Sequence, residues 1–142
     1  MKTRSHEHRI EIAASPERVW EGIADAKLLS QWILSRAEVD GRVDGHIKMD
    51  WGDEGVSEAR IEKWDPPRSL QVQHLPWEGC PPLPDSGGPR DTYSLEVSDG
   101  GTSLHLLCSN MSDDSAWDEF FEGTKQGWPH FLSKLKELLE NS

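Results

Sequence analysis

Cysteine is scarce in this chain of 142 residues, and long hydrophobic runs are missing. The two cysteines, Cys80 and Cys108, match no spacing typical of zinc ligands or of a redox motif. No apolar run approaches the roughly 20 residues that a transmembrane helix needs. The N-terminal MKTRSHEHRIEI also lacks the apolar segment of a signal peptide. We therefore expect a cytoplasmic protein with reduced thiols and no membrane partner.

Basic residues are in the minority. The chain has 15 Lys and Arg residues against 26 Asp and Glu residues, which gives a formal net charge of −11. A protein of this charge repels a phosphate backbone, and no basic stripe interrupts the acidic pattern, so nucleic acid is not an expected partner. An anionic membrane surface is unfavourable for the same reason. The sequence does not define an oligomeric state.

Short catalytic motifs are absent too. The chain has no Gly-x-Ser-x-Gly, His-Glu-x-x-His, P-loop or dinucleotide fingerprint, and no acidic pair is placed for general acid–base catalysis. His6 and His8 alternate on one strand face and could bind a metal ion, but no third ligand lies near them in the sequence. We predict no catalytic residue, cofactor or metal ion. Whether the protein is an enzyme stays open, and the missing motifs favour a negative answer.

Tryptophan, in contrast, is abundant. The chain has 7 Trp residues but only 1 Tyr and 3 Phe residues. Each Trp taken singly is best explained by core packing, whereas the group suits the wall of a large apolar pocket. The length predicts one domain over residues 1–142, which can bury a full core without disulfides or metals.

The apolar pattern predicts strands first and a long helix last. Residues 8–14 alternate as a half-buried strand, and Ser15 followed by Pro16 then favours the start of a helix. A second short helix is predicted over about 25–31. Six further strands are predicted at 37–40, 45–51, 57–64, 69–75, 92–97 and 102–109. Grouped strands with a terminal helix predict an α+β protein, with a curved antiparallel sheet of about six to seven strands wrapped around that helix.

A proline-rich segment interrupts the strands. Residues 76–90, PWEGCPPLPDSGGPR, combine five prolines with three glycines, a composition that excludes regular secondary structure. Each flank is too small to form a core alone, so we interpret this segment as a surface loop within the domain. Loops of this length are often functional or mobile.

The segment WDEFFEGTKQGWPHFLSKLKELLE, residues 117–140, contains helix-breaking residues. Its apolar side chains nevertheless stay within about 60° of Trp117 on a helical projection. Two separate helices would have no reason to share this phase, so we predict one helix. Pro129 cannot donate a hydrogen bond to the carbonyl of Lys125, and a kink is expected near 125–129. Space can remain between the bend and the sheet, or the kink simply follows the curvature of the sheet.

Four stretches carry a family likeness. IEIAASPERVWEGIADAKLLSQW resembles the opening of the START-like, or SRPBCC, superfamily. AEVDGRVDGHIKMD, WDPPRSL and WDEFFEGTKQGWPHFLSKLKELLE resemble its small bacterial branch, the single-domain homologues of the activator of the heat-shock protein 90 ATPase. The resemblance covers about His8 to Glu140. It implies the helix-grip (Bet v 1-like) fold, in which a cavity lies between the sheet and the long kinked helix. Asp44-Gly45 replaces the Gly-Gly that is usual in the family, and the 76–90 loop is longer than is typical.

We predict that this cavity binds a small hydrophobic or amphipathic molecule. His74 and Cys108 share strand faces with leucines and therefore point inward. We interpret Cys108 as an inert buried thiol, and a satisfied core histidine is favoured over a catalytic base at His74. His74, Tyr93 and Thr124 would orient the ligand. The predicted lining residues are Trp32, Trp51, His74, Tyr93, Leu95, Cys108, Phe121, Thr124 and Trp128.

Two alternatives remain open at this point. The resemblance also implies a chaperone-associated interaction module in the stress response, which would contact heat-shock protein 90 through the acidic surface. The other alternative is an enzyme of cyclase or hydrolase type that uses the cavity, with His74 as its base. The sequence does not identify the ligand.

Overall fold

The computed structural model describes residues 2–141, and within them the strands form one antiparallel sheet. The order across the sheet is β1-β7-β6-β5-β4-β3-β2. The strands are β1 (Thr3–Ile12), β2 (Arg36–Val39), β3 (His46–Asp50), β4 (Val56–Asp65), β5 (Ser69–His74), β6 (Arg90–Ser98) and β7 (Gly101–Ser112). The predicted curved antiparallel sheet of six to seven strands is confirmed.

Two short helices follow β1, and a long helix ends the chain. The Ser15 hydroxyl accepts a hydrogen bond from the backbone N–H of Arg18 at 3.2 Å and caps the first helix, as its sequence predicts. The helical elements are α1 (Pro16–Ala24), α2 (Ala26–Trp32), α3 (Asp118–Glu140) and the 3₁₀ turns η1 (Gly52–Glu54) and η2 (Ser115–Trp117). Among residues 2–141, no helix combines the length and the apolar character needed to cross a membrane.

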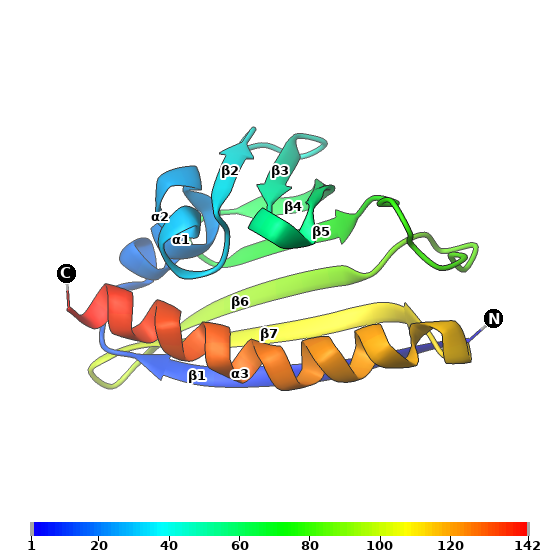
Figure 1. Cartoon of the computed structure of the whole chain (residues 1–142). Coiled ribbons are helices and arrows are strands. Elements are labelled where there is room, and N and C mark those ends of the chain that lie inside the picture. The colour runs from blue at the N-terminus through cyan, green and yellow to red at the C-terminus, as the bar shows by residue number, and fades with distance from the viewer. Residues whose placement is uncertain (1, 142) are drawn as a thin grey trace.

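The long helix α3 lies along the β1 side of the sheet. Figure 1 shows it running beside β1 and β7, with α1 and α2 near its C-terminal end. Arg4 in β1 forms an ion pair with Asp118 at 2.8 Å, where α3 begins. Just after β1, the backbone N–H of Ala13 donates to Glu140 Oε2 at 2.7 Å, where α3 ends. The helix is therefore held at both ends, and the predicted helix-grip fold is confirmed.

α3 is one continuous helix through Pro129, in agreement with the constant phase of its apolar residues. Its buried side chains, Leu132, Leu135 and Leu139, all follow the proline. Gly22 of α1 allows close packing here, because a Cβ at this position would lie 2.8 Å from a methyl group of Leu135. The C-terminal half of α3 thus packs tightly against the core. The N-terminal half leaves room between itself and the sheet.

Two strands begin earlier than the apolar alternation predicts. β1 begins at Thr3, because Arg4 and His6 continue the inward face of the strand while pairing with β7. β6 begins at Arg90, which brings Asp91 into the sheet with a buried side chain. The additional inward-facing residues are charged groups or imidazoles, so a search for hydrophobic periodicity does not find them.

A β-bulge changes the pairing between β1 and β7. Arg4 pairs with Met111 and His6 pairs with Cys108, so the register shifts between these two pairs. Asn110 lies within the shift at a φ of 58°, a conformation that asparagine tolerates better than most residues. Because of the extra residue, Cys108 and Met111 both point inward although they are an odd number of positions apart.

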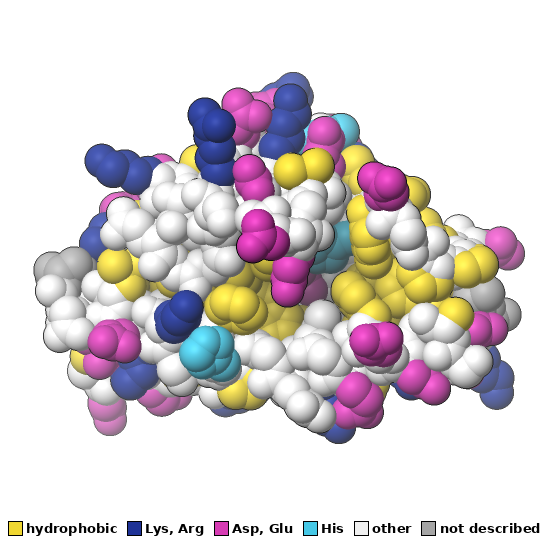
Figure 2. Space-filling view, viewed as in Figure 1, with side chains coloured by type: hydrophobic (Ala, Val, Ile, Leu, Met, Phe, Trp, Pro, Cys, Tyr) yellow, Lys and Arg dark blue, Asp and Glu magenta, His cyan; other side chains and the backbone are white. Residues whose placement is uncertain are grey.

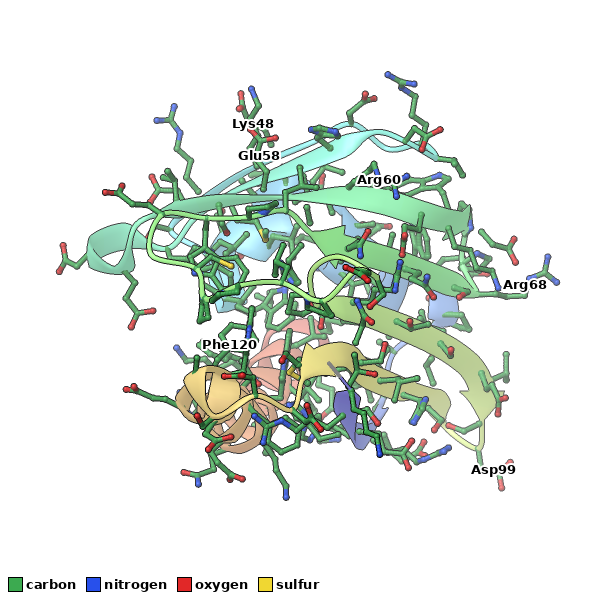
Figure 3. The ribbon with its side chains drawn as sticks, turned by 90° about the vertical axis from the view of Figure 1, so that its right-hand side faces the viewer. Lys48, Glu58, Arg60, Arg68, Asp99 and Phe120 are labelled. Carbon is green, nitrogen blue, oxygen red and sulfur yellow. The ribbon has the colours of Figure 1, made fainter. Side chains whose placement is uncertain are left out.

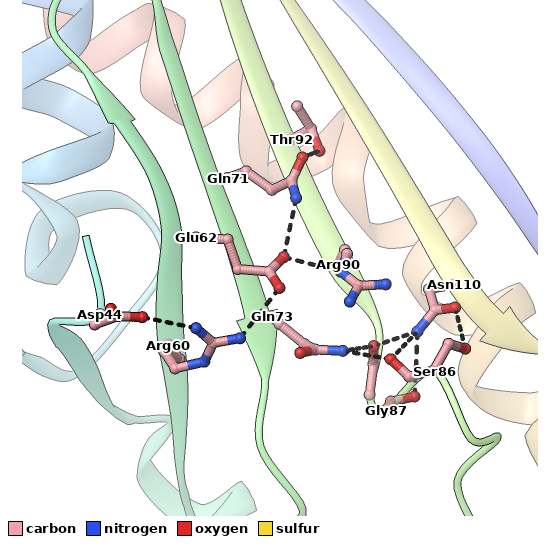
Figure 4. Close-up of polar contacts among 11 residues, drawn as sticks. Asp44, Arg60, Glu62, Gln71, Gln73, Ser86, Gly87, Arg90, Thr92 and Asn110 are labelled. Atoms are coloured by element: carbon pink, nitrogen blue, oxygen red, sulfur yellow. Dashed lines mark hydrogen bonds and ion pairs between the residues drawn. The ribbon is translucent and has the colours of Figure 1, made fainter.

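The loop between β5 and β6 contains neither helix nor strand, as its proline content predicts. Its second half is anchored to the bulge, as Figure 4 shows. The Asn110 side-chain amide donates to the backbone carbonyls of Ser86, Gly87 and Gly88 at 3.3, 3.2 and 2.9 Å. The Ser86 hydroxyl donates to Asn110 Oδ1 at 2.6 Å, and Gln73 donates to the Ser86 carbonyl at 2.9 Å.

The outer face of the sheet is polar. Figure 3 shows Lys48 and Glu58 pointing away from α3. Further along this face, Glu62 Oε1 accepts hydrogen bonds from Arg90 Nε at 2.8 Å and from Gln71 Nε2 at 2.9 Å (Figure 4). Burial alone would raise the pKa of Glu62, but these two donors outweigh it and the pKa is lowered. The apolar residues are thus left to the opposite face, which α3 covers.

Candidate functional site

A cavity of about 540 Å³ lies between the sheet and the N-terminal half of α3. Figure 2 shows hydrophobic side chains gathered in a hollow on this side of the molecule, with acidic side chains along its edge. The wall combines aliphatic residues from the strands and α2 with six aromatic residues. The aromatic residues are Trp51, Trp77, Tyr93, Phe120, Trp128 and Phe131.

Two glycines of α3 enlarge the cavity. Gly123 and Gly127 both lie in its wall. A Cβ at Gly123 would meet no atom within 4 Å, and one at Gly127 would meet only a ring carbon of Phe131, at 4.0 Å. Each glycine lowers helix stability by about 1 kcal/mol relative to alanine. At these two positions the helix is therefore less stable than it would be with alanine, and the cavity is larger.

Six of the nine predicted lining residues are in the cavity wall. They are Trp51, His74, Tyr93, Cys108, Thr124 and Trp128. Trp32 is buried in the core instead, where its indole N–H donates to the Gly22 carbonyl at 2.8 Å. Leu95 is also a core residue. Phe121 packs its ring against the edge of His6, with the two ring centroids 5.2 Å apart.

Sequence reasoning missed many residues of the wall, and three of them are instructive: Asp91, Phe120 and Trp77. Asp91 precedes Tyr93 by two positions, so the strand alternation would have found it if β6 had been extended by one pair. Phe120 points from α3 toward the sheet, as Figure 3 shows. Its neighbour Phe121 lies on the same stripe, so the helical projection does not show which of the two rings reaches the cavity. Trp77 lies in the irregular loop, where no periodicity could indicate its direction.

A polar patch interrupts the apolar wall where β5, β6 and β7 lie side by side. His74 Nε2 and Asp91 Oδ2 are 2.7 Å apart. Burial acts to lower the pKa of His74, but the Asp91 carboxylate outweighs it and the pKa is raised. Asp91 also pairs across the strands with Cys108. One carboxylate thus lies beside both the His74 imidazole and the Cys108 thiol.

The other two groups of the patch are neutral. Burial, followed by the proximity of Asp91, raises the pKa of the Tyr93 phenol well above its ordinary value. Burial and the Asp91 carboxylate likewise raise the pKa of the Cys108 thiol. A protonated thiol is a poor nucleophile, so Cys108 is not expected to act as one. Among the described residues, the Tyr93 hydroxyl has no hydrogen-bond partner, so it is free to bond to a ligand.

The proline-rich loop borders the cavity through Trp77. The Trp77 ring stacks on Phe120 with centroids 5.4 Å apart and meets Trp117 edge to face at 5.7 Å. The Trp117 indole N–H donates to the Pro82 carbonyl at 2.9 Å, which ties the loop to the start of α3. The loop therefore forms part of the cavity wall and does not lie only on the surface.

A second polar cluster lies between β1 and α3. His6 Nδ1 and His8 Nε2 are 2.8 Å apart, and His6 Nε2 lies 3.0 Å from the Thr124 hydroxyl oxygen. Burial, followed by the proximity of His8, lowers the pKa of His6 to about 4. Burial and then Lys125 lower the pKa of His8. Both imidazoles are therefore neutral at neutral pH, the form in which histidine binds metal ions.

A curved antiparallel sheet, a long helix across it and an apolar cavity between them define the class of helix-grip proteins. The chain belongs to the family of activator of Hsp90 ATPase homolog 1-like proteins, whose family model matches residues 13–140. No curated protein matches the sequence significantly.

Several solved structures are similar over nearly the whole chain. MLL2253 from Mesorhizobium loti is 22% identical, with a TM-score of 0.82 over 98% of each chain. The Aha1 dimer from Colwellia psychrerythraea is 25% identical, with a TM-score of 0.82 over 96% of each chain. CalU16 from Micromonospora echinospora is 20% identical, with a TM-score of 0.76 over 96% of this chain and 76% of its own. These likenesses establish the fold and leave the ligand to be argued from the cavity itself.

Proposed function

We propose that the protein binds a small molecule with a mainly hydrophobic surface and one polar group in the cavity beneath α3. The observation that supports this function is a cavity of about 540 Å³ with an aromatic wall and a small polar patch. Cavities of roughly 300–1,000 Å³ with this composition are typical of sites for small organic ligands. Burial of apolar ligand surface would contribute roughly 25 cal/mol per Å² before the costs of association.

The polar patch sets the orientation of the ligand in this proposal. The free Tyr93 hydroxyl donates a hydrogen bond to an oxygen acceptor on the ligand, such as a carbonyl or hydroxyl group. The Asp91 carboxylate is already paired with His74, so the patch as a whole favours a neutral polar group over a second carboxylate. The remainder of the ligand lies against Trp51, Phe120 and Trp128.

Native mass spectrometry of freshly purified protein, combined with fluorescence titration of an amphipathic naphthalene probe, tests ligand binding. Gly127→Met places a flexible apolar side chain in the cavity and is expected to reduce probe affinity at least tenfold. Gln126→Met adds the same side chain at an exposed neighbouring position of α3 and should leave the affinity within about twofold. Equal probe binding by both variants, with no adduct in the wild type, would rule out the cavity as a binding site.

The His74–Asp91 pair favours one second candidate, an enzyme that transfers a proton to or from the bound molecule. A histidine held 2.7 Å from a carboxylate in an apolar cavity is a common acid–base arrangement. The masses of the adducts on the wild type and on His74→Gln separate the two functions. A binding protein carries the same molecule in both cases. An enzyme accumulates unconverted substrate on the variant, so the two masses differ.

The chaperone-associated alternative rests on the family description alone. It predicts capture of the heat-shock protein 90 homologue of the same cell at low salt and release at moderate salt, because an acidic surface would provide the contact. Capture that is unchanged in Gly127→Met would separate this role from the cavity. An absence of capture at low salt would leave ligand binding as the remaining proposal.

A further inference from the structure

Three side chains that can bind a metal ion converge between β1, β7 and α3. His6 and His8 lie on β1, Cys108 lies on β7, and one donor atom of each lies within 4.8 Å of the others. We propose that these residues form a binding site for a divalent zinc ion. The sequence shows only the two histidines. The third ligand is supplied by the β1–β7 register, which places Cys108 opposite His6.

The distances are close to those that zinc requires. Zinc–nitrogen and zinc–sulfur bonds of about 2.0–2.1 and 2.3 Å in a tetrahedron place two nitrogens about 3.3 Å apart and a nitrogen about 3.6 Å from the sulfur. His6 Nδ1 and His8 Nε2 are 2.8 Å apart, so they must separate by roughly half an ångström. The Cys108 sulfur lies within 4.8 Å of the nitrogens, so it must approach them by at most about 1 Å, which side-chain rotation can supply.

Hydrogen bonds around the cluster orient the ligands. The Thr124 hydroxyl lies 2.9 Å from the Phe120 carbonyl and donates to it, so the Thr124 oxygen accepts from His6 Nε2–H at 3.0 Å. This tautomer leaves the lone pair of His6 Nδ1 directed at His8. Metal-binding histidines usually have their second nitrogen held in this way. Zinc binding displaces the proton of the Cys108 thiol, as it does for any cysteine ligand.

The surroundings limit access to one side. The Phe121 ring covers His6, and the Arg4 guanidinium lies over that ring, 4.5 Å from its centroid. His8 is only half-buried, so an ion can enter at this residue. Three protein ligands leave the fourth position of a tetrahedral ion to a water molecule, the arrangement seen in zinc sites that bind an exchangeable ligand. This site shares Cys108 and Thr124 with the cavity wall, but the proposal does not depend on a ligand in the cavity.

Cobalt(II) is a suitable probe, because its absorption spectrum reports both geometry and thiolate binding. Full-length protein freed of metal with a chelator should bind an equimolar amount of Co²⁺ with intense visible bands and a thiolate-to-cobalt charge-transfer band. Zn²⁺ should displace it. Cys108→Ser should lose the charge-transfer band. His8→Ala, at a half-buried position, should weaken Zn²⁺ binding by more than the roughly 10–100-fold that loss of an outer contact costs.

His105→Ala is the matched control. His105 lies on the opposite face of β7 and pairs with Glu7 at 2.8 Å, so its loss should leave Zn²⁺ affinity unchanged. Thr124→Val removes only the orienting hydrogen bond and should cost roughly 10–100-fold, which keeps the test decisive if His8→Ala does not fold. Equal Zn²⁺ affinities for wild type, His8→Ala and Thr124→Val, or a cobalt spectrum without the charge-transfer band, would overturn the proposal.

Discussion

Replacing both Gly123 and Gly127 with alanine is expected to stabilise the protein. Both residues lie inside α3, and a Cβ added at either position meets no atom closer than 4.0 Å. The new methyl groups therefore extend into the cavity or solvent without a clash. The gain comes from the helix itself, because glycine has more backbone freedom to lose on folding than alanine.

The magnitude follows from helix propensity and chain length. Each substitution is worth about 0.8–1.0 kcal/mol in a helix interior, so the pair is worth about 2 kcal/mol. Unfolding entropy is roughly 2.1 cal/mol/K per residue. For 142 residues this gives about 0.3 kcal/mol/K, and the melting temperature should rise by about 7 °C.

Differential scanning calorimetry of the wild type and the double variant measures this shift. Gly22→Ala is the matched control, since its Cβ would lie 2.8 Å from a Leu135 methyl group in the tightly packed half of the same helix pair. We expect it to lower the melting temperature. An unchanged or lower melting temperature for the double variant would refute the argument that glycine is retained at positions 123 and 127 for space rather than for stability.

Three further predictions concern the cavity wall and its supports. Trp128→Ala removes a ring that lies 6.3 Å from the Tyr93 ring centroid, and it should weaken binding of the naphthalene probe by about tenfold, measured by fluorescence titration. Leu138→Ala, at the packed end of α3, should lower the melting temperature but change probe affinity by less than about twofold. Asp91→Asn should bring the pKa of His74 from above to below its ordinary value, because burial then acts without an opposing charge; NMR titration measures this shift. In the wild type, the stabilisation that the His74–Asp91 pair contributes is full below pH 6.5 and is lost as the pH rises through the raised pKa of His74. Asn110→Gly allows the positive φ but removes the side-chain hydrogen bonds to the loop, so it should lower the free energy of unfolding by about 1–3 kcal/mol and speed proteolysis between residues 76 and 90. Equal cleavage rates in the wild type and the variant would show that these hydrogen bonds do not hold the loop.

Local patterns account for the elements that the sequence predicts correctly. Ser15 and Pro16 define the start of α1, because capping depends on atoms within one helical turn. The stripe from Trp117 to Leu139 predicts one helix through Pro129, because the phase of apolar residues survives the loss of one hydrogen bond. Alternation of apolar and polar residues predicts the strands, and it correctly predicts that His74 and Cys108 face inward.

The candidate site was only partly predictable, for a physical reason. Alternation shows which face a side chain occupies, not which inward-facing residues meet the cavity and which meet the core. Trp32 and Leu95 point inward but pack into the core, and Phe120 rather than Phe121 reaches the cavity although both lie on the same stripe. These differences depend on where α3 sits over the sheet, which is a property of the assembled fold.

The sequence by itself determined the fold class, the continuity of the last helix and the apolar character of the face beneath it, because each depends on residues close together in the chain. Only the tertiary structure decided which groups meet. Strand order brings Asp91 between His74 and Cys108, and the β1–β7 register with its bulge brings Cys108 to His6, although the two residues are far apart in the sequence. Register is set by pairing between distant strands, and a shift of one residue would turn each of these side chains to the opposite face.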